Sequence, residues 1–310
     1  MLAAALAAFV ATYAFIPWLI RSLRGTTAVG KDLNKAGRPL VPEMGGLGVM
    51  LGFYLGVSLL MVLAASVPAP FFYASLAASL GAGFVGLVDD MFGLRKRAKA
   101  LLPFLLAIPL GVVSYSTGDV YLLGINLGLM TVLVVPLGIT SAANATNMLE
   151  GLNGLGAGMG ILMTVTLVAV AYLQGTYSGL YIAFPLLGSL GAFLVFNKYP
   201  ARVFPGDSMT LFMGAAIASI AIVAHQKTLG AVLFAPMILE FGLKLRSHFR
   251  AENYGAPDQS GRLHYSGPIG SLTHVIMRKR PMKEWQIVAS VWGIEALVSS
   301  IVLLTVVLRW

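Results

Sequence analysis

The sequence predicts an all-α, polytopic integral membrane protein with about ten transmembrane helices. Three observations lead to this fold class. Of its 310 residues, 58% are hydrophobic and only 11% are charged, whereas soluble domains carry about 25% charged residues. The mean hydropathy of the chain is +0.85. Apolar runs of about 20 residues, the length that crosses a hydrocarbon core, recur throughout the sequence.

Ten apolar segments are long enough to be expected as membrane spans. Residues 2–20 carry no charge, and we expect a first span there rather than a cleaved signal. The segments at 100–115 and 229–243 are short and interrupted by prolines. The expected spans are 2–20, 44–66, 71–88, 100–115, 127–143, 155–173, 178–196, 208–224, 229–243 and 286–308.

Lysine and arginine residues are distributed over the loops in the way that sets membrane topology. Ten spans leave nine loops, and 19 of the 21 cations fall on odd-numbered loops, with only Lys227 and Arg309 elsewhere. Because Lys and Arg are enriched in cytoplasmic loops, we expect the odd loops in the cytoplasm and both termini on the non-cytoplasmic side. The result is a single transmembrane domain over 1–310, with cytoplasmic loops near 21–43, 89–99, 144–154, 197–207 and 244–285.

Several features exclude other classes of protein. The net charge of +9 does not indicate a nucleic-acid partner, because the cations follow membrane topology. The chain has no cysteine, which excludes disulfides and thiol chemistry. Gly81, Gly83 and Gly86 form a GxGxxG pattern inside an apolar span without βαβ context, so we expect them to pack helices together. His225 stands alone on an outer loop, and we interpret it as solvated.

The most informative stretch runs from Gly81 to Phe104, where an apolar run ends in two adjacent carboxylates, Asp89 and Asp90. Two negative charges at the end of an apolar segment are costly unless a cation binds them. The basic residues that follow obey the positive-inside rule, but that rule does not require acids beside them. A divalent metal, a cluster of cations that binds phosphate, or both would balance the two carboxylates.

Three further polar segments are expected on the same face, at 31–46, 144–158 and 197–212. The second of them contains three asparagines and no cation, so topology alone does not explain it. Asp89, Asp90, Asn147 and Asp207 offer hard oxygen ligands that suit Mg²⁺, with Mn²⁺ as an alternative. The absence of cysteine and the presence of only four histidines argue against zinc.

The segments DDMFGLRKRAK, NATNMLEGLNGL and FPGDSMTLF, which begin at Asp89, Asn144 and Phe204, resemble the three central motifs of the polyprenyl-phosphate N-acetylhexosamine-1-phosphate transferase superfamily. The likeness extends over about 31–227. It is closest to the eukaryotic and archaeal UDP-GlcNAc–dolichyl-phosphate GlcNAc-1-phosphate transferases, because Asn153 stands where bacterial members usually have aspartate.

The resemblance implies roles for the residues that match these motifs. Asp89 and Asp90 match the paired catalytic aspartates, and Lys99 matches the basic residue that contacts phosphate. Asn147 and Asp207 match the metal ligands. These five residues are therefore the expected centre of the active site.

Other residues are implied in substrate binding. Asn153 matches the residue that contacts the uracil, and Lys31, Asn34 and Glu43 lie in a KDLNK…PE segment that resembles the start of the eukaryotic enzyme. Glu150 departs from the small residue of the eukaryotic motif and resembles the acid of bacterial ones.

The likeness is weakest in the ninth loop, where members of the superfamily carry basic residues and histidines that hold the sugar. Here the chain offers the segment Arg246-Ser-His248-Phe-Arg250. We expect Arg246, His248 and Arg250 to contact the sugar and the pyrophosphate.

The resemblance implies a Mg²⁺-dependent phosphotransferase that moves GlcNAc-1-phosphate, or a related N-acetylhexosamine-1-phosphate, from a UDP-sugar to a polyprenyl or dolichyl phosphate. UMP is released, in the first committed step of N-glycan or cell-envelope glycan assembly. The expected partners are a UDP-N-acetylhexosamine, the lipid phosphate and membrane lipids, and a homodimer stays open. The protein would lie in a prokaryotic plasma membrane or a eukaryotic endoplasmic reticulum, with its active site facing the cytoplasm.

Two questions stay open at this point. The lipid phosphate can attack the UDP-sugar directly, after an aspartate takes its proton, or an aspartate can form a covalent phosphoenzyme first. A different class of function, a membrane transporter of anionic substrates, predicts charges at mid-bilayer and inverted repeats. The charges collect at one surface instead and no internal repeat is visible, so we favour the enzyme. A non-catalytic scaffold would not explain four clustered oxygen-ligand positions.

Overall fold

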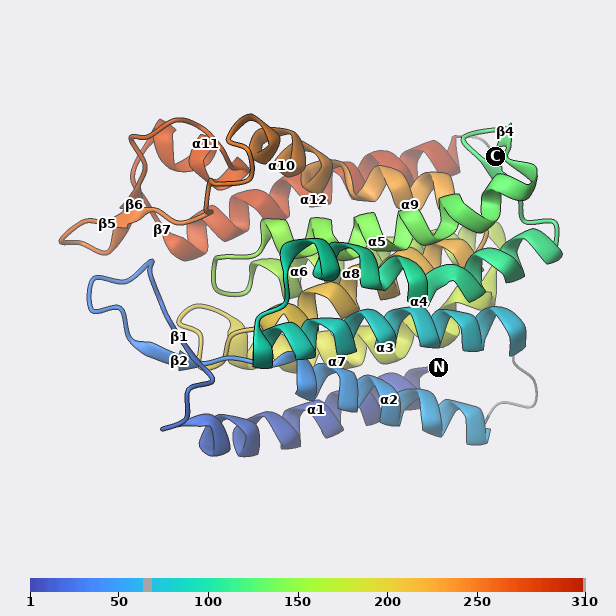
Figure 1. Cartoon of the computed structure of the whole chain (residues 1–310), viewed down its shortest axis with the longest axis horizontal. Coiled ribbons are helices and arrows are strands. Elements are labelled where there is room, and N and C mark those ends of the chain that lie inside the picture. Colours follow the sequence, from blue (N-terminus) through green and yellow to red (C-terminus); the bar gives the residue numbers. More distant parts are fainter. Residues whose placement is uncertain (64–68, 309–310) are drawn as a thin grey trace.

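The computed structural model of the protein describes residues 1–63 and 69–308, which form a bundle of long helices aligned along one axis (Figure 1). Within these residues, nine helices are long and apolar enough to cross a membrane, and two shorter helices that meet at 55° make a tenth candidate span. The expected all-α, polytopic membrane fold is confirmed. The last residues of the expected span 44–66 and Arg309 lie outside the described residues.

The helices follow the expected spans closely, because continuous apolar runs have no alternative to helix inside a bilayer. The first six are α1 (Leu2–Leu23), α2 (Gly46–Leu63), α3 (Ala69–Phe92), α4 (Lys96–Ser116), α5 (Thr131–Leu149) and α6 (Leu155–Gln174). The others are α7 (Leu180–Asn197), α8 (Gly206–Val223), α9 (Lys227–Leu233), α10 (Ala235–Arg246), the short α11 (Leu272–Lys279) and α12 (Glu284–Val307).

The helices differ most from the expected spans around the polar motifs. The expected loop 89–99 is confined to 93–95, since α3 continues to Phe92 and α4 begins at Lys96. The helix α5 likewise extends to Leu149, and α8 begins at Gly206. Asp89, Asp90 and Asp207, expected in or beside loops, therefore lie in terminal turns of helices. Their side chains find polar partners there, so the helices extend beyond the apolar runs.

The expected span 229–243 is the bent pair α9 and α10, which break at Phe234. Pro236 lies at the start of α10. Proline lacks the N–H that would continue the helical ladder, and it is tolerated in the first turn of a helix. The bend therefore has a local cause in the sequence.

The helix α8 forms the centre of the bundle, and almost all of its residues are buried. It packs against α3 through glycines: a Cβ on Gly86 would lie 2.2 Å from the carbonyl oxygen of Asp207, and one on Gly83 would lie 2.9 Å from Cβ of Phe212. Gly81 faces Leu106 of α4 in the same way. The interpretation of this GxGxxG pattern as a packing face is confirmed. It also brings the end of α3 to the start of α8.

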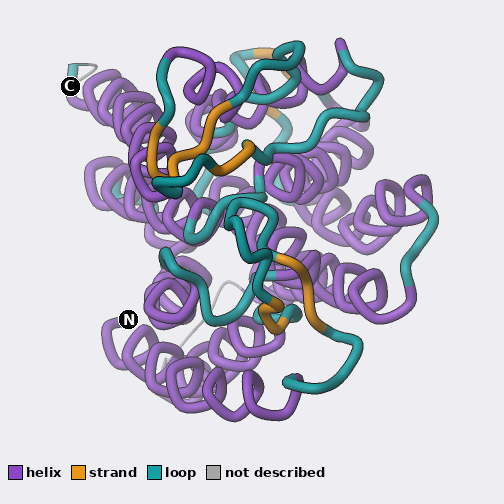
Figure 2. Tube along the Cα trace, turned by 90° about the vertical axis from the view of Figure 1, so that its left-hand side faces the viewer, coloured by secondary structure: helices purple, strands orange, loops and turns teal. Residues whose placement is uncertain are grey.

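Short strands occur only in the connections between helices in the described part of the chain. The hairpin β1–β2 (Val29–Lys31 and Leu40–Pro42) and the sheet of β5 (Ala256–Pro257), β6 (Arg262–His264) and β7 (Met282–Lys283) lie at one end of the bundle. Figure 2 looks onto this end, where loops and strands cover the helix ends. The hairpin β3–β4 (Tyr121–Leu122 and Ile125–Asn126) lies at the opposite end (Figure 1).

The opposite end carries its own charged cluster. Asp119 Oδ1 lies 2.8 Å from Nζ of Lys227 and 3.2 Å from Nδ1 of His225. Half of the His225 side chain is exposed, in agreement with its interpretation as solvated, but His225 does not stand alone, because it pairs with Asp119. These contacts tie the segment that follows α4 to the connection between α8 and α9.

Candidate active site

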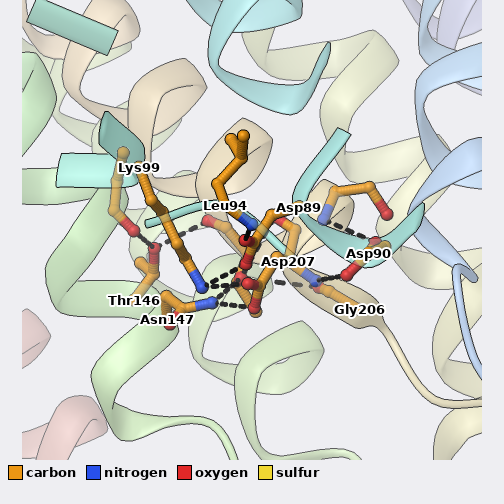
Figure 3. A network of polar contacts seen from close by, with 11 residues as sticks. Asp89, Asp90, Leu94, Lys99, Thr146, Asn147, Gly206 and Asp207 are labelled. Atoms are coloured by element: carbon orange, nitrogen blue, oxygen red, sulfur yellow. Dashed lines mark hydrogen bonds and ion pairs between the residues drawn. The ribbon is translucent and has the colours of Figure 1, made fainter. Parts of the chain in front are cut away.

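Four polar side chains from four helices meet at the end of the bundle shown in Figure 2. Asp89 comes from the last turns of α3, Lys99 from the first turn of α4, Asn147 from the end of α5, and Asp207 from the first turn of α8. Figure 3 shows their side chains pointing toward one another. We call these four residues the Lys99 cluster. The structure thus brings together four of the five residues expected at the centre of the site, and the fifth, Asp90, lies beside them.

The ammonium group of Lys99 joins the two carboxylates of this cluster. Its Nζ lies 2.9 Å from Oδ2 of Asp89 and also contacts Oδ2 of Asp207. The side chains of Lys99, Asp89 and Asp207 keep 20%, 14% and 23% exposure, so solvent reaches all three. Partial burial lowers the effective dielectric, so these charges interact more strongly than they would in water. An anionic group that enters the site can contact Lys99 without being fully desolvated.

Asn147 links α5 to α8. Its Nδ2 donates to Oδ1 of Asp207 and, at 2.9 Å, to Oγ1 of Thr210. The neighbouring Thr146 donates from Oγ1 to the carbonyl oxygen of Thr210 at 2.7 Å. These bonds fix the distance between the ends of α5 and α8, and with it the position of Asp207.

The paired aspartates have different surroundings. Asp89 accepts a hydrogen bond from the backbone N–H of Leu94 at 2.6 Å and faces Lys99. Asp90 accepts from the backbone N–H groups of Asp207 at 2.7 Å and Ser208 at 3.1 Å, at the start of α8. A carboxylate satisfies unpaired N–H groups at a helix N-terminus and interacts favourably with the helix dipole. Asp89 therefore faces the open site, while Asp90 holds a helix end.

The carboxylate and amide oxygens of the Lys99 cluster are of the type that Mg²⁺ prefers. A cationic group, the Lys99 ammonium, already fits between the carboxylates of Asp89 and Asp207. No group of three or more His, Cys, Asp or Glu side chains suited to a metal gathers in residues 1–63 and 69–308. An all-protein cage is not needed for Mg²⁺, which usually binds one or two carboxylates and completes its shell with substrate phosphates and water. Asp207 and the amide oxygen of Asn147 would supply the protein ligands.

A second polar group, which the sequence did not predict, surrounds Asn153. The backbone N–H of Asn153 donates to Oε1 of Glu284 at 2.7 Å, and the side-chain Nδ2 of Asn153 donates to Oδ2 of Asp32 at 3.2 Å. Lys35 bridges the two acids, 2.5 Å from Oδ2 of Asp32 and 3.0 Å from Oε2 of Glu284. Although burial opposes its charge, Glu284 and Asp32 raise the pKa of Lys35. We call Asp32, Lys35, Asn153 and Glu284 the Asp32 network.

The three residues of the first loop that were predicted to bind substrate have different surroundings. Asn34 donates from Nδ2 to the carbonyl oxygen of Gly151 at 3.0 Å, which joins the first loop to the fifth. The side chain of Glu43 lies against Gly30, and burial together with the charge of Asp90 raises its pKa. Lys31 is exposed. Asn34 and Glu43 thus lie near the site, and substrate contact by all three stays a prediction.

Arg246 is the last residue of α10, His248 and Arg250 follow it, and all three are exposed. None of the contacts of the described residues joins them to the Lys99 cluster, and their role in holding the sugar stays a prediction. A different residue joins the ninth loop to the fifth: Asn253 donates from Nδ2 to the carbonyl oxygens of Met148 at 2.9 Å and Glu150 at 2.6 Å. No sequence pattern indicated this role of Asn253, because a single asparagine in a polar loop does not reveal its partners.

Glu150 directly follows the last residue of α5. In the sequence it lies between Asn147 of the Lys99 cluster and Asn153 of the Asp32 network. The Oε2 atom of Glu150 is buried and has no hydrogen-bond partner among the described residues. It lies against Gly156, and a Cβ built on this glycine would be 1.9 Å from Oε2. Burial raises the pKa of Glu150 to about 7. Its charge therefore changes near neutral pH.

An apolar groove of about 360 Å³ lies between α5, α8 and the bent pair α9–α10. Gly138, Ser141 and Ala145 of α5 line it, together with Ala218 of α8 and Phe234 at the bend. Ala145, the lining residue nearest in sequence to the site, is two residues before Asn147. The proline-interrupted segment 229–243 contributes Gly230, Ala231, Phe234 and Ile238 to the lining, whereas the segment 100–115 contributes no residue.

Comparison with known proteins places this fold and site in a family. The profile described as glycosyl transferase family 4 matches residues 72–225, which include Asp89, Lys99, Asn147 and Asp207. A protein of Saccharolobus solfataricus is 41% identical over 94% of this chain and 92% of its own length. The chain therefore belongs to glycosyl transferase family 4.

The relatives carry related names. The Saccharolobus solfataricus protein is provisionally named UDP-N-acetylglucosamine–dolichyl-phosphate N-acetylglucosaminephosphotransferase, and a Schizosaccharomyces pombe enzyme with that name is 26% identical over 78% of this chain and 66% of its own length. A phospho-N-acetylmuramoyl-pentapeptide-transferase of Geobacillus is 29% identical over 73% of this chain and 74% of its own length.

Proposed function

We propose that this protein transfers N-acetylglucosamine-1-phosphate, or a related N-acetylhexosamine-1-phosphate, from a UDP-sugar to a polyprenyl or dolichyl phosphate, with release of UMP. The observation that carries the proposal is the Lys99 cluster, in which one ammonium contacts two carboxylates beside an amide, all partly open to solvent. Such a set of charges suits a pyrophosphate and its metal ion. The names of the relatives supply the substrate class.

In the proposed reaction, an oxygen of the lipid phosphate attacks the β-phosphorus of the UDP-sugar. A new P–O bond forms, the bond from the β-phosphorus to the bridging oxygen breaks, and that oxygen leaves with UMP. The product is a lipid-pyrophosphate-sugar. The roles of this chain's residues follow from where they lie around the site.

Asp89 is suited to accept a proton from the lipid phosphate, because it faces the open cluster. Asp90 is less suited, because its two oxygens accept backbone N–H groups of α8. Lys99 neutralises phosphate charge as it develops. Bound Mg²⁺, for which Mn²⁺ is an alternative, would absorb negative charge on the pyrophosphate, held by Asp207 and Asn147. A covalent intermediate on Asp89 is the alternative route.

The nucleotide and the lipid approach from different directions in this proposal. Asn153, in the loop after α5, holds the uracil, and the first and ninth loops cover it. The apolar groove holds isoprenoid units of the lipid, since its walls are almost entirely apolar and Ala145, two residues before Asn147, lines it. The nucleotide-sugar is charged and enters from the end that carries the loops, and the distribution of cations supports a cytoplasmic location for that end.

The direct test measures UMP release from UDP-GlcNAc by the purified protein in detergent, with and without polyprenyl phosphate and Mg²⁺. Release that needs both, and that Asp207→Asn abolishes while the protein stays folded, would support the proposal. A folded protein that releases no UMP from any UDP-N-acetylhexosamine under these conditions would contradict it. A burst of UMP without the lipid acceptor would favour the covalent route.

Sealed vesicles of known orientation test the sidedness. Activity is expected only when UDP-GlcNAc reaches the face that carries the loops between α3 and α4 and between α10 and α12. Activity with the nucleotide-sugar confined to the other face would refute the proposed topology, and with it a cytoplasmic active site.

A further inference from the structure

We propose that Asp32 fixes the orientation of the Asn153 amide and thereby makes the nucleotide site select uracil over cytosine. This inference rests on the proposed function, because it takes Asn153 as the residue that faces the base. It assigns to Asp32, which does not itself touch the substrate, the role of a positioning residue for base specificity.

The first step concerns which end of the amide faces Asp32. Asn153 is 6% exposed and Asp32 is 3% exposed, so water does not compete freely for their contact. The side-chain nitrogen of Asn153 lies 3.2 Å from Oδ2 of Asp32. An ionised carboxylate only accepts hydrogen bonds, so the NH₂ end of the amide must face it and the oxygen must face away. A rotation of the amide by half a turn would place two acceptors against each other.

The second step concerns what holds Asp32 in place. Lys35 lies 2.5 Å from Oδ2 of Asp32, and the backbone N–H of Asn34 donates to Oδ1 at 3.3 Å. Lys35 is held in turn by Glu284 at 3.0 Å. Glu284 also accepts the backbone N–H of Asn153 at 2.7 Å, so both the main chain and the side chain of Asn153 are held by the same network.

The third step concerns the chemistry of the two pyrimidines. N3 of uracil carries a proton and lies between two carbonyl groups, whereas N3 of cytosine is an acceptor beside an amino group. A freely rotating asparagine can match either base by exchanging its oxygen and its nitrogen. Oδ1 of Asn153 forms no hydrogen bond within the described residues, so this atom is left to accept from a base. An oxygen locked toward N3 accepts from uracil and is repelled by cytosine.

The expected consequence is a loss of discrimination rather than a uniform loss of binding. With Asp32→Asn, residue 32 gains an amide that both donates and accepts, so the Asn153 amide is free to rotate. The ratio of the UMP and CMP dissociation constants should then move toward one by about tenfold, because an unsatisfied polar pair no longer penalises cytosine. Glu284→Gln is the matched control, since it makes the same change from carboxylate to amide in this buried network and leaves Asp32 paired with Lys35.

The experiment measures binding of UMP and of CMP to the purified protein in detergent by calorimetry, for the wild type, Asp32→Asn and Glu284→Gln. A wild-type preference for UMP that Asp32→Asn reduces and Glu284→Gln preserves would support the inference. Equal reduction of UMP and CMP affinity in Asp32→Asn, with the ratio unchanged, would reduce Asp32 to a structural residue and overturn it. A wild type that does not distinguish the two nucleotides would overturn it as well.

A second variant covers the case in which Asp32→Asn does not fold. Asn153→Ala removes the amide and leaves every charge of the Asp32 network, and it should lower the UMP preference to near one. Retention of the wild-type ratio in this variant would overturn the inference. Failure of the proposed function is distinguishable, because it appears as absent UMP release from UDP-GlcNAc even when the binding ratios behave as expected.

Discussion

The carboxylate of Asp90 accepts a hydrogen bond from the backbone N–H of Asp207 at 2.7 Å, so one acidic residue of the site holds another in place (Figure 3). Gly206, with φ of +69°, precedes Asp207, and a Cβ on it would lie 2.5 Å from Oδ2 of Asp90. Only glycine combines this left-handed backbone with so close an approach. The Phe-Pro-Gly-Asp segment therefore serves the contact between α3 and α8 as well as the site.

Asp90→Ala should lower both stability and activity. The variant leaves two backbone N–H groups at the start of α8 without their acceptor, which costs about 1–2 kcal/mol by analogy with helix N-caps. Thermal unfolding in detergent should show the lower stability, and UMP release should fall because Asp207 is displaced. Asp89→Asn is the contrast: it should lose activity with little change in unfolding temperature. Equal stability of Asp90→Ala and wild type would contradict the holding role.

Glu150→Gln should stabilise the protein at alkaline pH. Burial raises the pKa of Glu150 to about 7, so the folded protein binds this proton more tightly than the unfolded chain does. Stability contributed by the protonated form is therefore lost as the pH rises from the ordinary glutamate value toward about 7. The variant stays neutral, so its unfolding temperature should exceed that of wild type by about 3–5 °C at pH 8 and converge with it at pH 5. A difference that does not vary with pH would contradict the assignment.

Replacement of His225 should show its effect at low pH, where replacement of Glu150 shows none. The hydrogen bond to Asp119 raises the pKa of His225, and the hydrogen bonds from His225 and Lys227 lower the pKa of Asp119 despite its burial. The pair is therefore fully charged below the ordinary histidine pKa of about 6.5, and its contribution is lost as the pH rises through the higher value in the folded protein. His225→Asn should lower the unfolding temperature by about 1–3 °C near pH 5.5 and by less above pH 8.

Asparagine is the suitable replacement because residue 225 has φ of +56°, which asparagine tolerates. The double-mutant cycle with Asp119→Asn provides the control. In that background, His225→Asn should add no pH-dependent loss. An equal loss in both backgrounds would assign the effect to something other than this ion pair.

The membrane spans could be predicted from the sequence because a bilayer requires continuous apolar helices. The ends of the helices at the site could not, since they depend on contacts between distant segments. The helix α3 continues through Asp89 and Asp90 because Lys99 and the start of α8 supply their partners. Composition alone assigns two adjacent aspartates to a loop.

The same limit explains why the polar motifs were found and the Asp32 network was not. Asn147 and Asp207 stand out because a carboxylate or amide at the end of an apolar run needs a partner. Lys35 and Glu284 are 249 residues apart, and each lies in a polar segment where a charged residue is unremarkable. Their pairing follows from how the first loop crosses the start of α12, which only the fold determines.

Gly138→Leu should block the lipid without affecting the nucleotide. Gly138 lines the apolar groove, and a Cβ built on it meets no atom within 4 Å, so a larger side chain occupies the groove rather than the helix interface. The variant should raise KM for polyprenyl phosphate by about tenfold, equivalent to the loss of roughly one or two buried isoprenoid methyl or methylene contacts, and leave KM for UDP-GlcNAc unchanged. UMP release at several lipid concentrations in detergent measures both constants.

Gly293→Leu is the matched control. Gly293 lies within α12, does not line the groove, and likewise has open space around a built Cβ. Both substitutions exchange glycine for a good helix former in a membrane-spanning helix, so their effects on helix stability should be similar. Only Gly138→Leu should weaken the lipid dependence. If both variants keep the wild-type KM for polyprenyl phosphate while remaining folded, the isoprenoid does not lie between α5, α8 and the bent pair, and the lipid must reach the Lys99 cluster by another face of the bundle.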